Sequence, residues 1–297
     1  MSRALRLFPI AVLSVSLFAV ERLRPVEVAR YPSFSAAVVF DSNGFGYVSH
    51  GRVITRISPD GTSAVWSELE GPRGHKILPN GSHLVCDAGR RAVLSLDANG
   101  KITGVASSEC DGKPLREPND LALDPRGGFY FTDSGGTQAR PAGAICFVDS
   151  LGKTHLAARD LQYPNGIVLR PDGKTLLVAE SRRNRILSYD VLAPGRLGPM
   201  KVFADLPSKQ GIDNQPDGMC LDLHGNLYVA HSGMKVVEVF SRKGRWIRQY
   251  PAGLTAASDV AFGGAKMNQL YISGGVGGRG EGGLFRLDLR TVKGLTP

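Results

Sequence analysis

Apolar and polar residues alternate along this chain in short runs, and the runs recur in one repeated unit. Each unit opens with small or polar residues, continues with four or five mainly apolar positions, and turns near a glycine before a second apolar run. A period near two indicates strands, and strands separated by turn residues are typical of sheets built from hairpins. The first runs of the six units are residues 36–41, 73–78, 119–124, 165–170, 217–222 and 259–262.

The turn glycines of the first five units set the size of the repeat. Gly44, Gly81, Gly127, Gly173 and Gly225 are separated by 37, 46, 46 and 52 residues. This spacing leaves room for four short strands and is typical of propeller blades. The sequence therefore predicts an all-β, six-bladed β-propeller with four antiparallel strands in each blade.

The two ends of the chain are expected to close the ring. The last unit offers only three strands after Asp259, whereas residues 24–30 form a spare strand with no local partner. We expect the N-terminal strand to join the last blade, because closure removes the free edges of an open sheet.

The repeat also predicts which residues gather at one face. In each blade the first strand begins, and the antiparallel second strand ends, at that face. We expect the following residues around the axis, with the sixth placed only roughly: Ala36, Arg73, Asn119, Asn165, Asp217 and Asp259. Farther out we expect the residues that end the second strands: His50, Asp87, Asp133, Glu180 and His231.

The axial residues suggest a metal site. Asn119, Asn165 and Asp217 offer hard oxygen ligands of the kind that suit Ca²⁺. The alternative is that Asn165-Gly166 and Asp217-Gly218 are only turn dipeptides. The shared structural position in consecutive blades favours the metal site.

Three stretches resemble the gluconolactonase and regucalcin family of calcium-dependent propeller hydrolases, and above all its drug-responsive lactonase branch. The first stretch runs from Pro118-Asn119-Asp120-Leu121 to Asp133. The second runs from Asn165-Gly166-Ile167 to Ser181, and the third from Pro216-Asp217-Gly218 to Ala230. The likeness covers residues 38–286 in order.

The resemblance implies a set of site residues. In the family a Glu from the first blade, two Asn and an Asp hold one catalytic Ca²⁺. Asn119 and Asn165 match the asparagines, and Asp217 matches the aspartate that is both ligand and base or nucleophile. The family's Glu falls on Ala36, which has no ligand atom, so calcium binding is expected to be weaker. Ser35, Asp120 or a water fills the vacancy, or the protein has abandoned the metal and uses Arg73, His50 and His231.

The resemblance implies that this protein hydrolyses a sugar lactone or related ester. Calcium would polarise the carbonyl, and Asp217 would activate the water. His231, on the same blade as Asp217, is a reserve acid–base residue. Arg73, His75, Lys76 and Asp120 are expected to bind or orient the substrate. Two alternatives stay open: a metal-independent lyase or a condensing enzyme like strictosidine synthase, and a propeller that only binds.

Charge excludes some partners. The net charge is +9, but the basic residues are scattered, and the one cluster, residues 181–185, lacks the interleaved aromatics that stack bases. We therefore expect a small-molecule substrate, no nucleic acid, no stable membrane partner beyond a possible N-terminal anchor, and a monomer.

The cysteines and the N-terminus bear on compartment. Cys86, Cys110, Cys146 and Cys220 lie far apart without C-x-x-C spacing, so we expect buried thiols, with a disulfide of Cys86 or Cys110 left open for an oxidising compartment. Residues 1–20 carry two arginines and a fourteen-residue apolar run, the shape of a secretory signal or, if uncleaved, an anchor. Residues 21–297 are then one propeller domain, periplasmic or secreted; an uncleaved N-terminus would leave it cytoplasmic or membrane-anchored.

Overall fold

The computed structural model describes residues 23–135, 140–278 and 280–295. The expected export signal, residues 1–20, lies outside the described residues. Within them, no helix is long and apolar enough to cross a membrane.

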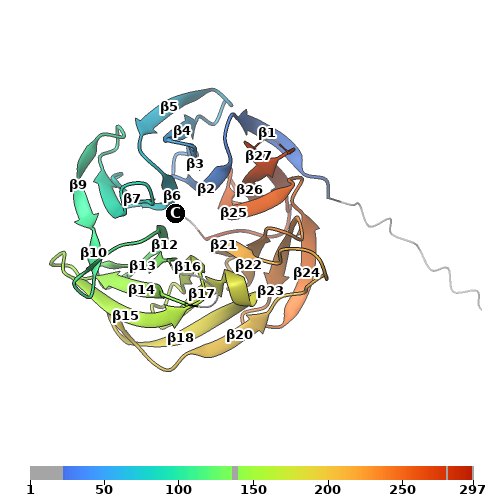
Figure 1. The fold of residues 1–297 in the computed structure, drawn as a ribbon. Coiled ribbons are helices and arrows are strands. Elements are labelled where there is room, and N and C mark those ends of the chain that lie inside the picture. Colours follow the sequence, from blue (N-terminus) through green and yellow to red (C-terminus); the bar gives the residue numbers. More distant parts are fainter. Residues whose placement is uncertain (1–22, 136–139, 279, 296–297) are drawn as a thin grey trace, which may run out of the picture.

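The chain forms a ring of six twisted sheets around one axis, which confirms the predicted propeller (Figure 1). The innermost strands are β2 (Ser35–Phe40), β6 (Pro72–Ile77), β12 (Pro118–Leu123), β16 (Pro164–Leu169), β21 (Pro216–Leu221) and β25 (Ala256–Gly263). The second strands are β3 (Gly46–His50), β7 (His83–Asp87), β13 (Phe129–Asp133), β17 (Thr175–Glu180), β22 (Leu227–His231) and β26 (Gln269–Val276).

The outer half of each blade follows the same antiparallel order. The third strands are β4 (Val53–Ile57), β8 (Ala92–Leu96), β14 (Gly143–Val148), β18 (Arg185–Ala193), β23 (Val236–Phe240) and β27 (Glu281–Asp288). The outermost strands are β5 (Ser63–Glu68), β9 (Ile102–Ser107), β15 (Thr154–Leu161), β20 (Lys201–Asp205), β24 (Trp246–Pro251) and β1 (Val26–Tyr31). Small additions are β10 (Glu109–Cys110), β11 (Lys113–Pro114), β19 (Arg196–Leu197) and a 3-10 turn, Ser181–Arg183.

The N-terminal strand closes the ring as expected. β1 pairs antiparallel with β27, and Arg30 and Tyr31 lie opposite Gly283 and Gly282. The sixth blade therefore combines strands from both ends of the chain, and its outer edge is formed by β1 (Figure 1).

The hydrophobic core lies between neighbouring blades. Tyr130 and Ile145 of the third blade pack with Leu176 and Leu187 of the fourth, and similar clusters join the other blades. Every residue of β13 is buried, because a second strand is covered on both faces. The inner strands are thus held rigidly, and their first residues are fixed around the axis.

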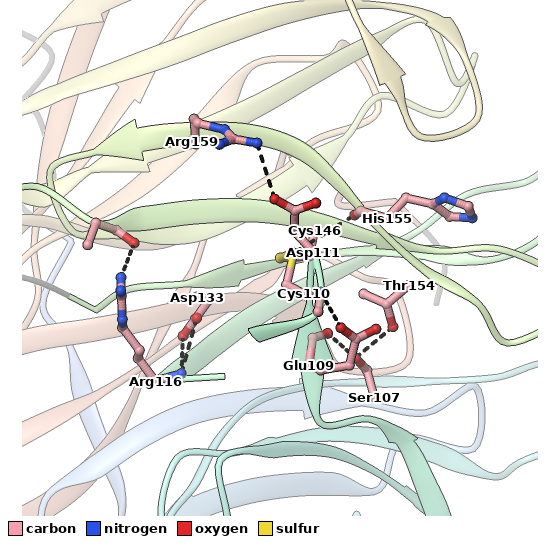
Figure 2. Close-up of a disulfide and its surroundings, with 12 residues drawn as sticks. Ser107, Glu109, Cys110, Asp111, Arg116, Asp133, Cys146, Thr154, His155 and Arg159 are labelled. Carbon is pink, nitrogen blue, oxygen red and sulfur yellow. Dashed lines mark hydrogen bonds and ion pairs between the residues drawn. A yellow bond between two sulfur atoms is a disulfide. The ribbon is translucent and has the colours of Figure 1, made fainter. Parts of the chain in front are cut away.

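One disulfide modifies the third blade. Cys110 on β10 is bonded to Cys146 on β14, with the two Cα atoms 6.2 Å apart (Figure 2). The expectation of four buried thiols is therefore wrong for this pair and confirmed only for Cys86, while Cys220 is partly exposed. The β10–β11 hairpin, inserted between the second and third blades, folds over β14 and brings the two cysteines together.

Candidate functional site

A β-bulge at the start of each inner strand turns one residue toward the axis. In three consecutive blades the register with the second strand shifts between Pro118 and Leu121, between Pro164 and Ile167, and between Pro216 and Met219. A bulge carries an extra residue and bends the strand locally. Asn119, Asn165 and Asp217 are the residues that follow these prolines, so they occupy equivalent places in blades three to five.

Glycines beside the axial residues make room for neighbouring blades. A Cβ on Gly74 would collide with the carboxylate of Asp120, and a Cβ on Gly218 would collide with that of Asp259. Glycine is therefore required after Arg73 and after Asp217 by the close packing of the next blade, and not by a turn.

Asp120 and Asp259 join the blades on either side of them. Asp120 accepts hydrogen bonds from the backbone N–H groups of Leu121, at 2.8 Å, and of Ile167 in the fourth blade, at 3.0 Å. Asp259 accepts in the same way from Val260, at 2.8 Å, and from Val38 in the first blade, at 3.0 Å. Both carboxylates thus accept hydrogen bonds from backbone N–H groups, and the contact of Asp120 with substrate stays a prediction.

In the sixth blade the axial position falls on Ser258, one residue before Asp259, which the sequence had roughly placed there. Ser258 takes the place that Asn119 has in the third blade, and its hydroxyl donates to the carbonyl of Ala36 at 2.8 Å. Asp259 lies one position deeper along the strand, as Asp120 does.

Lys76 supplies a positive charge inside the channel. Burial lowers the pKa of its ammonium, but the carboxylates of Asp120 and Asp259 raise it by more, so the pKa lies above its usual value. Burial and the Asp120 charge raise the pKa of Asp259 to about 7, against an opposing effect of Lys76. Lys76, Asp120 and Asp259 thus form a cluster of one cation and two acids inside the channel.

Asp217, which follows Pro216 at the start of β21, is the carboxylate among the three axial residues of blades three to five. Burial, and then the negative charges of Asp259 and Asp120, raise its pKa well above the usual range, while Arg73 and a hydrogen bond with Asn165 lower it. A buried carboxylate that is costly to ionise is stabilised in its charged form by a cation.

The donor set at the axis is made of oxygen atoms. No cluster of three or more histidine, cysteine, aspartate or glutamate side chains suited to a metal occurs among the described residues. Asn119 and Asn165 are 9% and 7% exposed, and with Asp217 they offer two amide oxygens and one carboxylate, which suit a hard divalent cation. Ala36 offers nothing from the first blade.

A cavity of about 600 Å³ opens at the face where the inner strands begin, and its lining includes Ala36, Arg73 and Glu117. Arg73 follows the proline of the second blade, and its guanidinium lies 3.6 Å from the Glu117 carboxylate. The hydroxyl of Tyr163 donates to the same carboxylate at 2.7 Å. Arg73 therefore connects the cavity to the axis, where its charge acts on Asp217.

Two other predicted residues lie elsewhere. His75 is buried between the first two blades, with Nδ1 3.3 Å from the hydroxyl of Ser49, and burial holds its pKa well below the usual value. His231 is fully buried, with Nδ1 3.6 Å from a carboxylate oxygen of Glu238. Neither lines the cavity around Arg73, so their predicted roles in substrate binding and acid–base chemistry stay predictions.

The acids that end the second strands of blades three and four accept hydrogen bonds from backbone N–H groups. Asp133 accepts from the N–H of Glu117 at 2.6 Å, and Glu180 accepts from the N–H of Gln162 at 2.8 Å. Asp133 thereby positions Glu117, which the sequence did not single out. Only its place two residues before Asn119 could have drawn attention to it.

Comparison with known proteins gives relatives of similar fold. Lactonase drp35 of Staphylococcus saprophyticus is 31% identical over 194 residues, which cover 62% of this chain and 57% of the relative. The diisopropyl-fluorophosphatase of Loligo vulgaris is 26% identical, with coverage of 69% and 74%. The chain spans 40–58% of the length of the staphylococcal lactonases that it matches.

Among solved structures, the calcium-binding protein regucalcin of Agrobacterium tumefaciens superposes with a TM-score of 0.78 at 21% identity, covering 93% of this chain and 96% of that one. This likeness concerns the fold. The family model described as the SMP-30/gluconolactonase/LRE-like region matches residues 48–275, most of the propeller. The chain therefore belongs to the SMP-30/gluconolactonase/LRE-like family.

Proposed function

We propose that this protein is a hydrolase that opens a sugar lactone or a related cyclic ester, with a divalent cation, calcium, at the propeller axis. Relatives named lactonase and gluconolactonase support the reaction class. The observation that carries the proposal is the placement of Asn119, Asn165 and Asp217 at one bulge position in three consecutive blades.

The residues at the axis fit calcium through three protein oxygens. Asn119, Asn165 and Asp217 would hold the ion, and water would complete its coordination, because Ala36 replaces the expected carboxylate. A cation bound beside Asp217 would offset the burial and the neighbouring acids that raise its pKa, since a nearby positive charge favours the ionised form. When bound, calcium supplies a Lewis acid that polarises the ester carbonyl.

Asp217 is the group that we propose takes a proton from the attacking water. A carboxylate beside a cation is a weak base, so its contribution comes from position and requires a water within about 3 Å. Arg73, which lines the cavity and acts electrostatically on Asp217, orients the substrate. The Asn165 amide, through its hydrogen bond to Asp217, fixes the carboxylate.

The proposal is tested by measuring calcium binding and hydrolysis separately. Calcium should raise the melting temperature of the wild type, and Asp217→Asn should abolish that shift and lower kcat by about 100-fold or more. A panel of aldonolactones and acyl lactones, assayed with calcium and with chelator, measures the reaction. Lactone hydrolysis that survives both chelator and Asp217→Asn contradicts the proposal.

His231→Gln separates a structural from a chemical role for that residue. His231 is fully buried against Glu238, so kcat should change only a few-fold if the ring serves packing. A larger fall in kcat with an altered pH profile and unchanged melting temperature would support the acid–base role.

A metal-independent enzyme on the same scaffold is the second candidate, favoured by one observation. Arg73 and Asp217 are oppositely charged groups that interact at the axis, and Ala36, which lines the cavity, carries no ligand atom. A guanidinium would then serve as counter-ion to Asp217. Under this alternative calcium leaves the melting temperature unchanged, whereas Arg73→Met lowers it.

A further inference from the structure

We propose that the preferred substrate is a lactone carrying a carboxylate, and that Arg73 binds that carboxylate in the cavity beside the axis. The inference rests on the proposed lactone hydrolysis and specifies its substrate class. Four features carry it: the charge of the cavity wall, the unused donors of Arg73, the way the Arg73 side chain is held, and the methyl group of Ala36.

The wall of the cavity is positively charged. Arg73, Arg91 and Arg116 line it, against a single carboxylate, that of Glu117. Arg116 is tied to the backbone, because its guanidinium donates to the carbonyl of Ala142 at 2.8 Å (Figure 2). A concave surface with an excess of one charge concentrates ligands of the opposite sign.

Arg73 keeps its hydrogen-bond donors for a ligand. Its side chain is 38% exposed, and within the described part of the chain it donates no hydrogen bond to another residue. Glu117, at 3.6 Å, balances its charge from a distance too long for a good hydrogen bond. A guanidinium presents a planar fork of donors that matches a carboxylate.

Glu117 is held in place from two directions, which fixes Arg73 as well. Tyr163 donates to the Glu117 side chain at 2.7 Å, and the backbone N–H of Glu117 is bonded to Asp133 at 2.6 Å. The guanidinium of Arg182 lies 4.8 Å from the ring centre of Tyr163. Because Glu117 and Tyr163 already hold the Arg73 side chain, its guanidinium loses little conformational freedom when a ligand binds.

Ala36 leaves space and places no charge in the cavity that Arg73 lines. It lines the same cavity, and the β2 backbone beside it is fixed by the hydrogen bond that Ser258 donates to its carbonyl. A carboxylate side chain at this position would pair with Arg73 and repel an anion. With a methyl group there, the substrate's own carboxylate can reach the guanidinium.

The experiment compares two lactones that differ at one carbon. D-Glucono-1,4-lactone carries a hydroxymethyl group where D-glucaro-1,4-lactone carries a carboxylate. At fixed free calcium, kcat/KM should favour the glucarolactone by roughly 10- to 100-fold, the effect of a hydrogen bond to a charged group. Arg73→Met should abolish the preference, and Ala36→Glu should reverse it.

Matched variants exclude a general charge effect. Arg242→Met also removes one guanidinium, but Arg242 pairs with Asp172 at 3.5 Å on the far face, so the preference should stay within about twofold of wild type. Arg73→Lys keeps the charge without the planar fork and should retain only part of the preference. It also replaces Arg73→Met if that variant does not fold.

Calorimetry with D-glucarate and D-gluconate, at the same free calcium, keeps the inference separate from catalysis. Wild type should bind glucarate at least about tenfold more tightly, and Arg73→Met should bind both alike. Equal or weaker binding of glucarate, or a preference for gluconolactone, overturns the inference and leaves lactone hydrolysis intact. If no lactone of the panel is hydrolysed, including these two, the proposed function fails and the calorimetric result alone decides the inference.

Discussion

At the residue scale, Lys76 shows how this propeller tolerates acids in its channel. Asp120 and Asp259 each bind backbone N–H groups of a neighbouring blade, so both are fixed where they stand. Lys76 is the cation whose charge acts on both. A buried charge that loses its partner is costly, because the remaining group is neither solvated nor paired.

Lys76→Met is expected to lower the free energy of unfolding by roughly 3–5 kcal/mol at pH 8. The loss should be smaller at pH 5.5. Because the pKa of Asp259 is raised to about 7, this residue stabilises the fold at low pH, where it is protonated, and that contribution is lost as the pH rises through about 7. Without Lys76 the pKa of Asp259 rises further. The free energy of unfolding of the variant therefore falls most at pH values at which Asp259 is ionised in the wild type.

Urea unfolding at the two pH values measures this effect. Lys153→Met, at an exposed turn, serves as the control and should lie within about 0.5 kcal/mol of wild type at both. Equal losses for Lys76→Met at pH 5.5 and pH 8 would show that packing, not charge, explains its effect.

The histidines mark the limit of sequence reasoning at this scale. The repeat placed His231 at the end of a second strand, which the structure confirms, with His231 opposite Pro216 in the pairing of β21 and β22. It did not reveal the direction of the side chain, because successive residues of a strand face opposite neighbours. His231 faces Glu238 inside the blade packing, and His75 faces Ser49.

At the element scale, the bulge of the inner strand and its glycine act together. Gly218 lies directly after Asp217, in the space that the Asp259 carboxylate of the next blade occupies. The bulge turns Asp217 toward the axis, and the glycine lets the neighbouring strand approach closely. Blade packing and site geometry are thus encoded by the same two residues.

Gly218→Ala is expected to destabilise the protein by roughly 2–4 kcal/mol, because Asp259 must move and weaken its bond to the Val38 N–H. Gly104→Ala is the matched control, since a Cβ at Gly104 meets no atom within 4 Å. Thermal and urea unfolding of the two variants compare them. Equal stability of the two would refute the steric role of Gly218.

Strands and their order could be predicted because a period of two and regularly spaced turn glycines are local signals. The β10–β11 hairpin and its disulfide could not. Cys110 and Cys146 are 36 residues apart, and their pairing depends on an insertion that folds back across β14. Spacing alone cannot specify such a contact.

At the scale of the whole molecule, the Cys110–Cys146 disulfide is evidence about the cellular compartment of the protein. Disulfides persist in oxidising compartments, and this one joins Cys110 to Cys146 in the third blade (Figure 2). We propose that the protein is exported, as the apolar run within residues 1–20 suggests. Labelling of the unfolded, unreduced protein from its native cells should then detect two free thiols, Cys86 and Cys220; four would contradict export.

Removing the bond should cost stability. Replacing both Cys110 and Cys146 by alanine is expected to lower the free energy of unfolding by about 3–4 kcal/mol, the chain-entropy value for a loop of this length. A reductant should destabilise the wild type to a similar extent and leave the double variant unchanged. If reductant also destabilises the double variant, its effect on the wild type does not come from breaking the Cys110–Cys146 bond.

Pairing of β1 with β27 also has a consequence for biosynthesis. Residues 26–31 leave the ribosome among the first of the described chain, yet their partner, residues 281–288, is made almost last. The N-terminal strand therefore stays unpaired until the strands of the other five blades have been made. Until β27 emerges, the nascent chain lacks the partner of β1 and exposes free strand edges, so it depends on protection from aggregation.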